Sequence, residues 1–532
     1  MSEPVILACD IGTSRCKVSL FDARGRQVAE SEEGYAVRFG PGNTAEQNPT
    51  DWWRAFARTT EALSERGLIS THNGACVVVT GQMSACLPVD RAGEPLRPAM
   101  IWADQRASAE SALIERSIGR DRLYRVTGNP PSETYPAPKI LWLRKHEPEV
   151  FARTASFLQP KDYLVFRLTG RMVTDHSDAS CTGLFDLERR VWSDAILAEL
   201  TLRADLFPDV VPSTHVVGTV TRAAAQLSGL PEGLPVVIGG GDGPTAAVGA
   251  GAAAVGSGYI NLGTSAWLSF CRETPLFDDR QRTFNYCHLV PGRYALTGAM
   301  QSAGASYDWC RRLLAGGDNA TQPGSGDTPP APGDLPERIP PGCDGLTFLP
   351  YLLGERTPYW DPQAAGAFVG LRPFHGRAHL LRAVLESIGL HLRLIHDVFL
   401  EQGVSADHLA VIGGGANNDL LPQMLSDMLQ KPLTTRHLTT GATSFGAAIC
   451  GAVGIGILKS FDDLGEWAPP ARTLNPDLGR EPVYRAAYRR FRFAYQALQP
   501  YFQLADSLPV DSNAATTAGS GSVDATASDQ RR

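Results

Sequence analysis

The sequence lacks the marks of several common classes of nucleotide-binding and metal-binding protein. No Gly-Lys dipeptide occurs in its 532 residues, so the Walker A pattern of P-loop proteins, which requires one, is excluded. Its ten cysteines include no C-x-x-C pair. That scatter argues against a cysteine-ligated metal or a dithiol site and predicts reduced, mostly buried thiols in a cytoplasmic protein.

Basic charge and long apolar runs are also scarce. Lys and Arg number 49 against 56 Asp and Glu, and the net charge of −7 argues against nucleic acid or an anionic membrane as the main partner. No stretch supplies the ~20 strongly apolar residues of a membrane span. The most apolar later stretches, 245–260 and 446–458, are rich in Ala and Gly and are expected to be packed helices. The N-terminal residues include neither a positively charged segment nor the apolar segment that follows it in a signal peptide. We therefore expect no secretory signal and predict cytoplasmic localisation.

Two apolar strands each run into a short loop of small residues. Residues 5–9 lead into Asp-Ile-Gly-Thr-Ser at 10–14, and residues 259–262 lead into Gly-Thr-Ser at 263–265. Such loops let backbone N–H groups approach anionic oxygens, because Gly adds no Cβ. Their duplication indicates two similar half-molecules facing one nucleotide. A third loop, Gly-Gly-Gly-Asp-Gly at 239–243, follows a strand at 234–238.

Two of these loops carry a carboxylate that phosphoryl transfer could use. The reaction needs amide cradles, an acid that holds metal and a residue that orients the attacking hydroxyl. Asp10 could hold Mg²⁺ while Thr13 contacts phosphate oxygens, and Asp242 could accept the proton of a sugar hydroxyl. Structural alternatives stay open: Asp10 as a residue of the turn that ends the strand, and Asp242 as the cap of a helix that Pro244 begins.

Two other classes of protein were weighed against phosphoryl transfer. Residues 241–246 fit a relaxed dinucleotide fingerprint, G-x-G-x-x-A, but no Asp or Glu lies between Gly243 and Glu273 to hold a ribose. This absence disfavours a nicotinamide oxidoreductase. A non-enzymatic actin-like or chaperone-type nucleotide switch would share the loops and stays open.

The rest of the chain alternates strand-like and helix-like segments. Apolar residues recur at helical spacing through 378–401, and Gly403 supplies a stop. The other predicted elements are strands at 17–21, 75–80 and 409–412, helices at 51–64 (capped by Thr50 or Asp51), 157–169 and 419–430, a polar loop at 174–180, a surface insertion at 316–341 and a disordered tail at 511–532.

Taken together, these residues resemble the FGGY carbohydrate kinases, and most closely the xylulokinases of that family, over about residues 5–499. The most specific match is Gly-Ala-Phe-Val-Gly-Leu at 366–371, followed by His379-Leu380 and by Ala-Val-Leu-Glu at 383–386. The other matching runs are 10–14, 81–83, 102–106, 138–143, 160–164, 174–175 with 177–180, and 239–242.

The resemblance implies an α/β protein of two actin-like (ribonuclease H-like) domains with a catalytic cleft between them. The implied domains are 1–254, which binds sugar and carries the catalytic acid, and 255–505, which binds nucleotide, with a disordered tail at 506–532. The implied ligands are ATP, Mg²⁺ and a small-molecule sugar or polyol, without nucleic acid or membrane, and association into a homodimer is left open.

The resemblance also assigns roles by position. Asp242 corresponds to the catalytic base and Asp10 to the magnesium-associated acid. The positions implied for sugar binding are Gln82, Met83, Ser84 and Asp104. The positions implied for phosphate and nucleotide binding are Gly12, Thr13, Thr264, Gly304, Gly414, Gly415 and Asn417.

Departures from the xylulokinase pattern bear on the substrate. Ser84 stands where xylulokinases usually carry His, and Gly243 replaces a frequent Asn. Trp102-Ala103-Asp104 also resembles the gluconate kinases of the same family. D-xylulose, converted to D-xylulose 5-phosphate, is the best single expectation; gluconate, ribulose and a tetritol are the alternatives.

Overall fold

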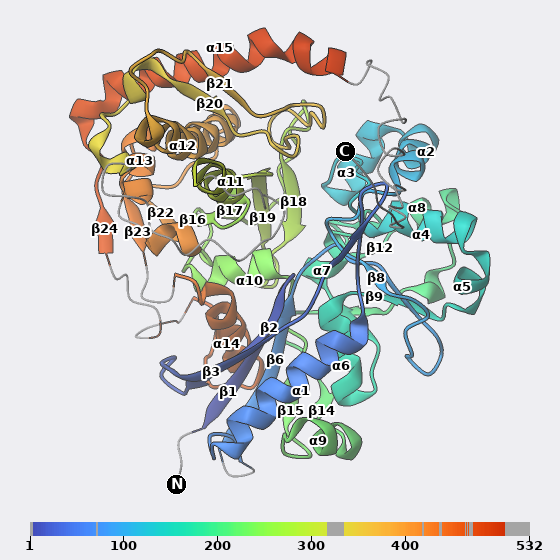
Figure 1. The fold of residues 1–532 in the computed structure, drawn as a ribbon. Coiled ribbons are helices and arrows are strands. Elements are labelled where there is room, and N and C mark those ends of the chain that lie inside the picture. The colour runs from blue at the N-terminus through green and yellow to red at the C-terminus, as the bar shows by residue number, and fades with distance from the viewer. Residues whose placement is uncertain are drawn as a thin grey trace, which may run out of the picture.

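The chain folds into two mixed sheets, one from each half of the sequence, with helices on their faces (Figure 1). The computed structural model describes residues 4–70, 73–315, 335–417, 420–435, 439–462, 464, 467 and 472–505. The predicted α/β class is confirmed. The predicted tail and most of the predicted insertion, 316–334, lie outside the described residues.

The first sheet has six strands in the order β14-β15-β6-β1-β2-β3. Strand β1 pairs antiparallel with β2 and parallel with β6. The apolar side chains of β1 and β6 are almost fully buried because helices cover both faces of these central strands. The strands are β1 (Val5–Ile11), β2 (Arg15–Asp22), β3 (Gln27–Gly34), β6 (Gly74–Gly81), β14 (Val216–Thr219) and β15 (Pro235–Val237).

The second sheet has seven strands and repeats the central arrangement of the first. Its order is β18-β19-β17-β16-β22-β23-β24, and β16 pairs antiparallel with β17 and parallel with β22. The expected duplication is therefore present, with β16 as the counterpart of β1. The strands are β16 (Gly258–Leu262), β17 (Ala266–Arg272), β18 (Phe284–Cys287), β19 (Tyr294–Met300), β22 (Leu409–Ile412), β23 (Leu433–Thr435) and β24 (Arg472–Leu474).

Short strands and fifteen α-helices complete the described part of the chain. The short strands are β4 (Arg38–Gly40), β5 (Thr44–Gln47), β7 (Leu87–Val89), β8 (Ala99–Met100), β9 (Ser156–Leu158), β10 (Val173–Asp175), β11 (Phe185–Asp186), β12 (Val191–Trp192), β13 (Asp209–Val211), β20 (Thr347–Leu349) and β21 (Ala367–Val369). The helices are α1 (Pro49–Glu65), α2 (Ser108–Ile118), α3 (Arg120–Thr127), α4 (Pro136–His146), α5 (Pro148–Arg153), α6 (Pro160–Thr169), α7 (His176–Ser180), α8 (Asp194–Glu199), α9 (Arg222–Ser228), α10 (Asp242–Gly249), α11 (Gly304–Leu314), α12 (Arg377–Glu401), α13 (Leu420–Leu429), α14 (Ala442–Gly454) and α15 (Glu481–Ala505).

The best-predicted helix is α12, whose bounds differ from 378–401 by one residue at its start. It ends just before Gly403, which has φ +72°. The N-terminus of α1 was misplaced: Asn48 caps it, and the helix begins at Pro49. None of the described helices is both long and apolar enough to cross a membrane.

Three other predicted segments were wrong in part. The helix expected at 157–169 begins at Pro160, because β9 occupies the residues before it and Pro favours the first helical position. The loop expected at 174–180 is the end of β10 and helix α7, which the Asp175 side chain caps. The apolar stretch 245–260 is helical only to Gly249, and β16 begins at Gly258.

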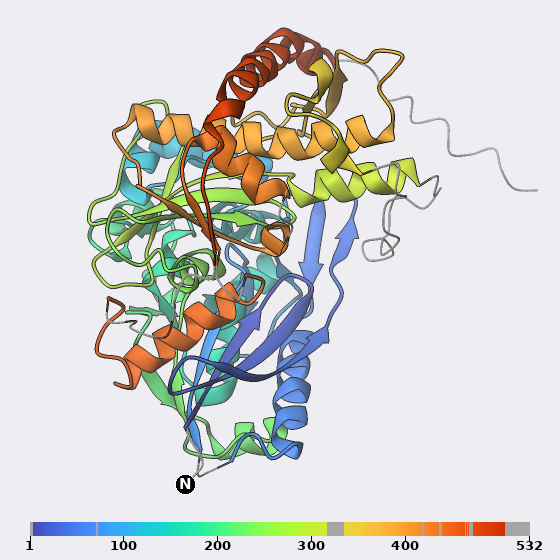
Figure 2. The ribbon, with the colours of Figure 1, turned by 90° about the vertical axis from the view of Figure 1, so that its left-hand side faces the viewer.

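Helices α10 and α14 lie between the two sheets and cross closely (Figures 1 and 2). A Cβ on Gly249 would lie 1.8 Å from the carbonyl oxygen of Ala442, and one on Gly446 would lie 2.0 Å from that of Thr245. Helix α14 comes from the second half of the chain, yet its apolar side chains pack with those of β1, β6 and β15. The core of the first half therefore includes a helix from the second.

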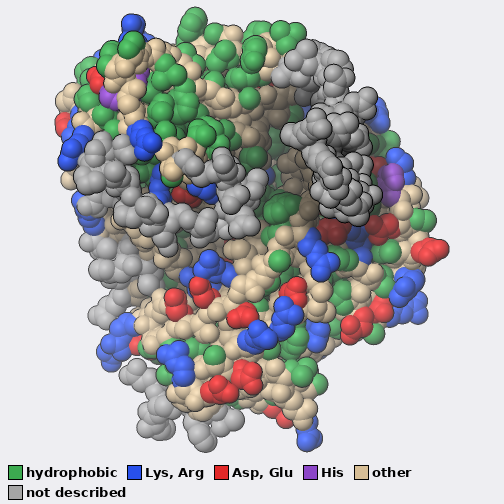
Figure 3. Space-filling view, in the orientation of Figure 1, with side chains coloured by type: hydrophobic (Ala, Val, Ile, Leu, Met, Phe, Trp, Pro, Cys, Tyr) green, Lys and Arg blue, Asp and Glu red, His purple; other side chains and the backbone are tan. Residues whose placement is uncertain are grey.

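The outer surface is uneven in character. Exposed apolar side chains gather at the top of the molecule around α15 (Figure 3). They include Val483, Phe493 and Tyr501, and Phe493 is 71% exposed. Charged side chains of both signs are mixed over the lower half. The same view is hollowed near its centre, between the half that carries the second sheet and the half that carries the first.

Candidate active site

The glycine loop at 239–243 lies against the ends of β6 and β1. Gly239 has φ +69°, and a Cβ there would lie 1.9 Å from the Val79 carbonyl oxygen, so only Gly fits. Gly241 forms an isolated parallel bridge with Gly81 and is packed by the side chain of Met83. The loop thus brings Asp242 beside the loops that follow β1 and β6.

Asp242 is the first residue of α10, and Gly241 occupies the cap position. The structure therefore does not support the reading of Asp242 as the helix cap. Its half-buried carboxylate accepts a 2.8 Å hydrogen bond from the Gly243 N–H. Burial raises the pKa of Asp242 to about 6, although backbone hydrogen bonds partly oppose the rise. The carboxylate is therefore mostly ionised at neutral pH and able to accept a proton.

Asp10 lies near the end of β1 and faces the same space. Burial, together with repulsion from the Asp242 charge, raises the pKa of Asp10 to about 7, while Lys17 acts in the opposite direction. Two carboxylates that repel each other in this way suit a shared cation. Within the described ranges, no group of three or more His, Cys, Asp and Glu side chains could hold a metal ion. A cation here would depend on these two carboxylates and on oxygens of a bound phosphate.

The loop that follows β1 is held from behind by side chains. Tyr35 donates a hydrogen bond to the Gly12 carbonyl oxygen (2.5 Å), and Gln47 donates one to the Thr13 carbonyl oxygen (2.5 Å). The Trp102 indole N–H donates to the Thr13 hydroxyl (2.9 Å). These bonds fix the loop, and the one from Trp102 engages the Thr13 hydroxyl itself.

Gln82 and Ser84 belong to the segment for which the sequence predicts sugar contacts. Gln82 is 1% exposed and donates to Gly12 O (3.3 Å) and to the Gln47 side chain (2.7 Å), so it supports the loop that follows β1. Ser84 has φ +62°, and its carbonyl accepts from the buried Lys139 ammonium (2.9 Å). Lys139 also bonds two other carbonyl oxygens, and burial lowers its pKa to about 8. The role of Lys139 in fixing this segment was missed, although the residue lies in a matching run.

Asp104, also predicted to contact sugar, is hydrogen-bonded to other parts of the protein. Its side chain is 0% exposed, and it accepts hydrogen bonds from Ala45 N (2.7 Å) and from the Arg106 guanidinium (2.6 Å at Nη2). In this arrangement Asp104 anchors the loop that carries Trp102. Its predicted sugar contact would require these bonds to open.

The predicted nucleotide residues of the second half gather around the end of β16. Gly304, at the start of α11, donates to the Gly263 carbonyl oxygen (3.0 Å), and a Cβ on Gly304 would lie 2.6 Å from that oxygen. The Thr264 carbonyl accepts from Ala303 N (2.9 Å). The loop before α11 is therefore bonded to the loop after β16.

The loop that contains Gly414 and Gly415, also predicted to bind nucleotide, follows β22, which pairs with β16. A Cβ on Gly415 would lie 2.9 Å from the Leu262 Cβ, so this loop also touches the end of β16. Gly414 is exposed and has nothing within 4 Å of its Cβ position. Asn417 is exposed and accepts a hydrogen bond from the Thr439 hydroxyl. The open face at Gly414 leaves room for a ligand to lie against the backbone.

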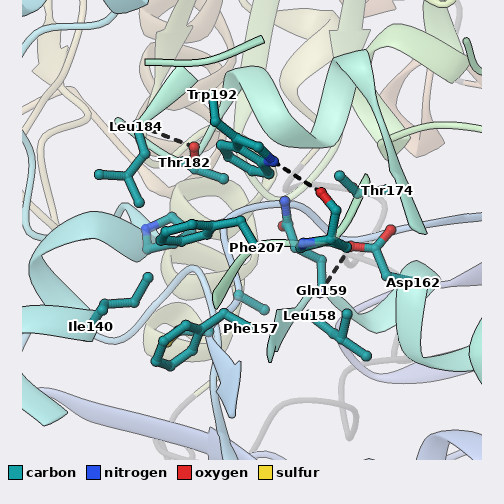
Figure 4. Close-up of a pocket in the computed structure, with 14 residues that line it drawn as sticks. Ile140, Phe157, Leu158, Gln159, Asp162, Thr174, Thr182, Leu184, Trp192 and Phe207 are labelled. Carbon is teal, nitrogen blue, oxygen red and sulfur yellow. Dashed lines mark hydrogen bonds between the residues drawn. The ribbon is translucent and has the colours of Figure 1, made fainter. Parts of the chain in front are cut away.

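A separate small cavity lies behind the predicted sugar segment (Figure 4). Its walls carry Phe157, Trp192 and Phe207 on one side and Gln159 and Asp162 on the other. The space open to the centre of a water molecule is about 20 Å³, enough for about one water. Because it is too small for a sugar or a nucleotide, this cavity is not the substrate site.

The two halves of the chain match the two domains of one protein family. Residues 5–249 match the N-terminal domain, and residues 258–455 the C-terminal domain, of the FGGY family of carbohydrate kinases. A xylulose kinase of Escherichia coli (strain K12) is 34% identical over 494 residues, which cover 93% of this chain and 99% of that protein.

Solved structures show the same likeness over the whole fold. A xylulose kinase from Rhodospirillum rubrum superposes with a TM-score of 0.83 at 30% identity, over 94% of this chain and 100% of the other. A gluconate kinase from Lactobacillus acidophilus gives a TM-score of 0.86 at 25% identity, over 94% and 99% of the two chains. The two-domain actin-like architecture expected from the sequence is confirmed by this likeness.

Proposed function

The chain belongs to the FGGY family of carbohydrate kinases, and on that premise we propose that it transfers the γ-phosphoryl group of ATP to a hydroxyl of D-xylulose, giving D-xylulose 5-phosphate. Family membership makes the protein a sugar kinase, a phosphotransferase with an alcohol group as acceptor. It also removes the non-enzymatic nucleotide switch as an alternative. The nucleotide, the metal and the identity of the sugar are the proposed parts.

The observation that carries the mechanism is the position of Asp242. Its ionised carboxylate faces Asp10, beside the phosphate loop of the first half, and Tyr259 on β16 links its neighbour Gly243 to the second half. In the proposed reaction the Asp242 carboxylate accepts the proton of the sugar hydroxyl as that oxygen attacks the γ-phosphorus; the bond from the γ-phosphorus to the β,γ-bridging oxygen breaks, and ADP leaves. Backbone N–H groups and hydroxyls near Thr13 and Thr264 orient the phosphates.

ATP and Mg²⁺ fit the residues on the two sides of the site. The proposed nucleotide pocket is made by Gly304, Gly414, Gly415 and Asn417, and the proposed phosphate contacts are Gly12, Thr13 and Thr264. Asp10 would hold Mg²⁺ together with phosphate oxygens, in keeping with the few protein ligands that this ion takes. When bound, Mg²⁺ neutralises charge on the β- and γ-phosphates.

The likeness to the xylulose kinase of E. coli, which matches this chain almost from end to end, favours D-xylulose as the substrate. Met83 and Ser84 are the proposed sugar contacts. A specific observation favours a second candidate, gluconate: Ser84 replaces the usual His, and the gluconate kinase structure superposes as well as the xylulose kinase one. Loss of a potential hydrogen-bond partner changes which polyol a buried site prefers.

One assay tests the substrate proposal. ADP release is measured with ATP, Mg²⁺ and, in turn, D-xylulose, D-ribulose, gluconate, glycerol and erythritol. We expect the highest kcat/KM with D-xylulose. A higher value for gluconate, or for any other acceptor, would replace D-xylulose as the substrate.

A second measurement tests the role of Asp242. Asp242→Asn keeps an acceptor for the Gly243 N–H but cannot take a proton, so we expect turnover to fall at least about a hundredfold. Asp90→Asn is the matched control, because Asp90 also accepts backbone N–H bonds, in a turn remote from the site. Near-normal turnover in Asp242→Asn would contradict proton acceptance by this residue.

A further inference from the structure

Four charged side chains lie fully buried behind the glycine loop. Lys161, on α6, places its ammonium 2.7 Å from the Asp162 carboxylate and 3.3 Å from those of Asp175 and Asp178. All four side chains are 0–1% exposed. Buried charges are costly unless they are paired and hydrogen-bonded, so such a cluster needs a structural or functional reason.

Asp175 is the hub of this cluster. Its Oδ2 atom accepts the hydroxyl proton of Ser177 (2.6 Å), the backbone N–H of Ser177 (2.9 Å) and the hydroxyl proton of Ser213 (2.7 Å). Burial raises the pKa of Asp175, but the Lys161 charge and these hydrogen bonds outweigh burial and lower it overall. Asp175 is therefore an ionised acceptor with fixed donors.

Both serines that bond Asp175 also bond the glycine loop. The Ser177 hydroxyl accepts the N–H of Gly241 (2.9 Å), and the Ser213 carbonyl accepts the N–H of Gly239 (2.9 Å). Between these two bonds, a Cβ on Gly240 would lie 2.8 Å from the Ser177 hydroxyl and 3.2 Å from Asp175 Oδ2. The loop is thus hydrogen-bonded at Gly239 and Gly241, and Gly240 between them lies close to the Asp175 carboxylate.

We propose that Asp175 is a positioning residue for catalysis, which sets the place of the Asp242 carboxylate through Ser177 and Ser213. Gly241 directly precedes Asp242, so a shift of the Gly241 N–H moves the carboxylate with it. Misplacement of a reacting group by ~1 Å can cost about a hundredfold in rate. The inference rests on the proposed function, because it takes Asp242 as the proton acceptor.

The surrounding charges strengthen the hydrogen bonds that link Asp175 to the glycine loop. Burial raises the pKa of Asp178 well above its usual range and also raises that of Asp162, despite Lys161, so the Lys161 charge is left mainly to Asp175. Hydrogen bonds to charged groups in a low-dielectric interior are strong, and a network of them resists displacement. A neutral hydroxyl network on the surface would hold the loop less firmly.

The first test removes one hydroxyl. Ser177→Ala is expected to lower kcat about ten- to a hundredfold and to leave the KM for sugar and the Kd for ADP within about twofold. Ser228→Ala is the matched control, because Ser228, at the end of α9, is also 0% exposed and its hydroxyl bonds only backbone groups, those of Ala224 and Leu230. An equal kcat in the two variants, or a parallel change in kcat, KM and Kd, would overturn the proposal.

The second test asks whether Ser177 acts through Asp242. In the Asp242→Asn background, Ser177→Ala should cause no further loss of the residual turnover, because the group that it positions is gone. An additive loss would overturn the inference. If Asp242→Asn alone keeps normal turnover, the proposed function fails instead, so the two failures are distinguishable.

A third variant guards against a folding defect. Ser213→Ala removes the other hydroxyl bonded to Asp175 but leaves the Ser213 carbonyl that holds Gly239. We expect a smaller fall in kcat, about three- to tenfold, again with KM unchanged. Should Ser177→Ala fail to fold, an unchanged kcat in a folded Ser213→Ala protein would overturn the proposal.

Discussion

The hydroxyl of Tyr259 donates a 2.8 Å hydrogen bond to the carbonyl oxygen of Gly243. Tyr259 lies on β16, the strand that leads into the loop of Thr264, and Gly243 directly follows Asp242. The Trp267 indole N–H donates to the same hydroxyl at 2.7 Å. One buried hydroxyl therefore links the strand that precedes the Thr264 loop in the second half to the turn in the first half that carries Asp242, the proposed proton acceptor.

Tyr259→Phe removes this link and almost nothing else. We expect the free energy of unfolding to fall by about 1–3 kcal/mol, because the Gly243 carbonyl and the Trp267 N–H lose a buried partner. We also expect a lower kcat, since the turn at Asp242 loses one support. Trp267→Phe is the control: it should destabilise the protein but keep kcat, because the Tyr259–Gly243 bond stays. Equal kcat values in the two variants would show that the bond has no bearing on catalysis.

Gly414→Ala separates ligand binding from folding. Nothing lies within 4 Å of the Cβ position, so denaturant unfolding should change by less than ~0.5 kcal/mol. If the nucleotide lies against this glycine, the added methyl group should raise the Kd for ADP about tenfold or more, as measured by calorimetry. Gly376→Ala, equally open and at the start of α12, should leave the Kd unchanged. An unaltered Kd in Gly414→Ala would remove this residue from the pocket.

Gly446→Ala tests the contact of α10 with α14. The new Cβ would lie 2.0 Å from a backbone oxygen, which cannot move alone, so we expect destabilisation of about 1–3 kcal/mol or more. Gly451→Ala, in the same helix, meets only side-chain atoms at 3.0 Å and beyond. There the helix-propensity gain of ~1 kcal/mol should offset the crowding. Equal midpoints of denaturation in the two variants would contradict the tight crossing.

Glu355 should make stability depend on pH. It is buried beneath the loop before α11, accepts the Gln301 N–H (2.9 Å) and lies 3.6 Å from His391. Burial raises the pKa of Glu355 to about 8, above its usual 4.5. Between these values the folded protein binds more protons at this site than the unfolded chain, so this contribution to stability falls as pH rises.

Glu355→Gln removes that titration and keeps an oxygen that can accept the Gln301 N–H. We expect the Tm of the variant, relative to the natural protein, to rise steadily from pH 5.5 to pH 8.5. His391, whose pKa burial lowers to about 4, contributes to both proteins and cancels in the difference. A Tm difference that stays constant with pH would show that Glu355 is ionised in the folded state.

The pattern of apolar residues correctly predicted the strands and the helix in which that pattern is unbroken. The strands at 5–9, 75–80 and 259–262 were confirmed because continuous apolar runs end in glycine loops, and α12 because its apolar spacing is unbroken. Pattern was misleading at Pro160, which divides an apolar run into a strand and a helix, and at Asn48, which caps α1 ahead of the predicted caps Thr50 and Asp51. The site roles, the domain boundaries, cytoplasmic localisation and a homodimer stay predictions.

The contacts of the supporting residues could not be found from the sequence. Lys161 and Asp175 lie in matching runs, but charged residues are seldom fully buried, so composition alone would place them on the surface, and Ser213 lies 38 positions beyond Asp175. Asp104 likewise reads as an exposed polar residue until the Arg106 guanidinium is seen to enclose it. Such partners are set by long-range packing, for which a single sequence carries no periodic signal.

The position of α14 has a consequence during protein synthesis. The six strands of the first sheet emerge from the ribosome long before residues 442–454, which cover part of their apolar face. Until that helix is translated, side chains such as Ile6, Ala8 and Val78 have no α14 to pack against. The core of the amino-terminal half is therefore complete only once α14 has been translated.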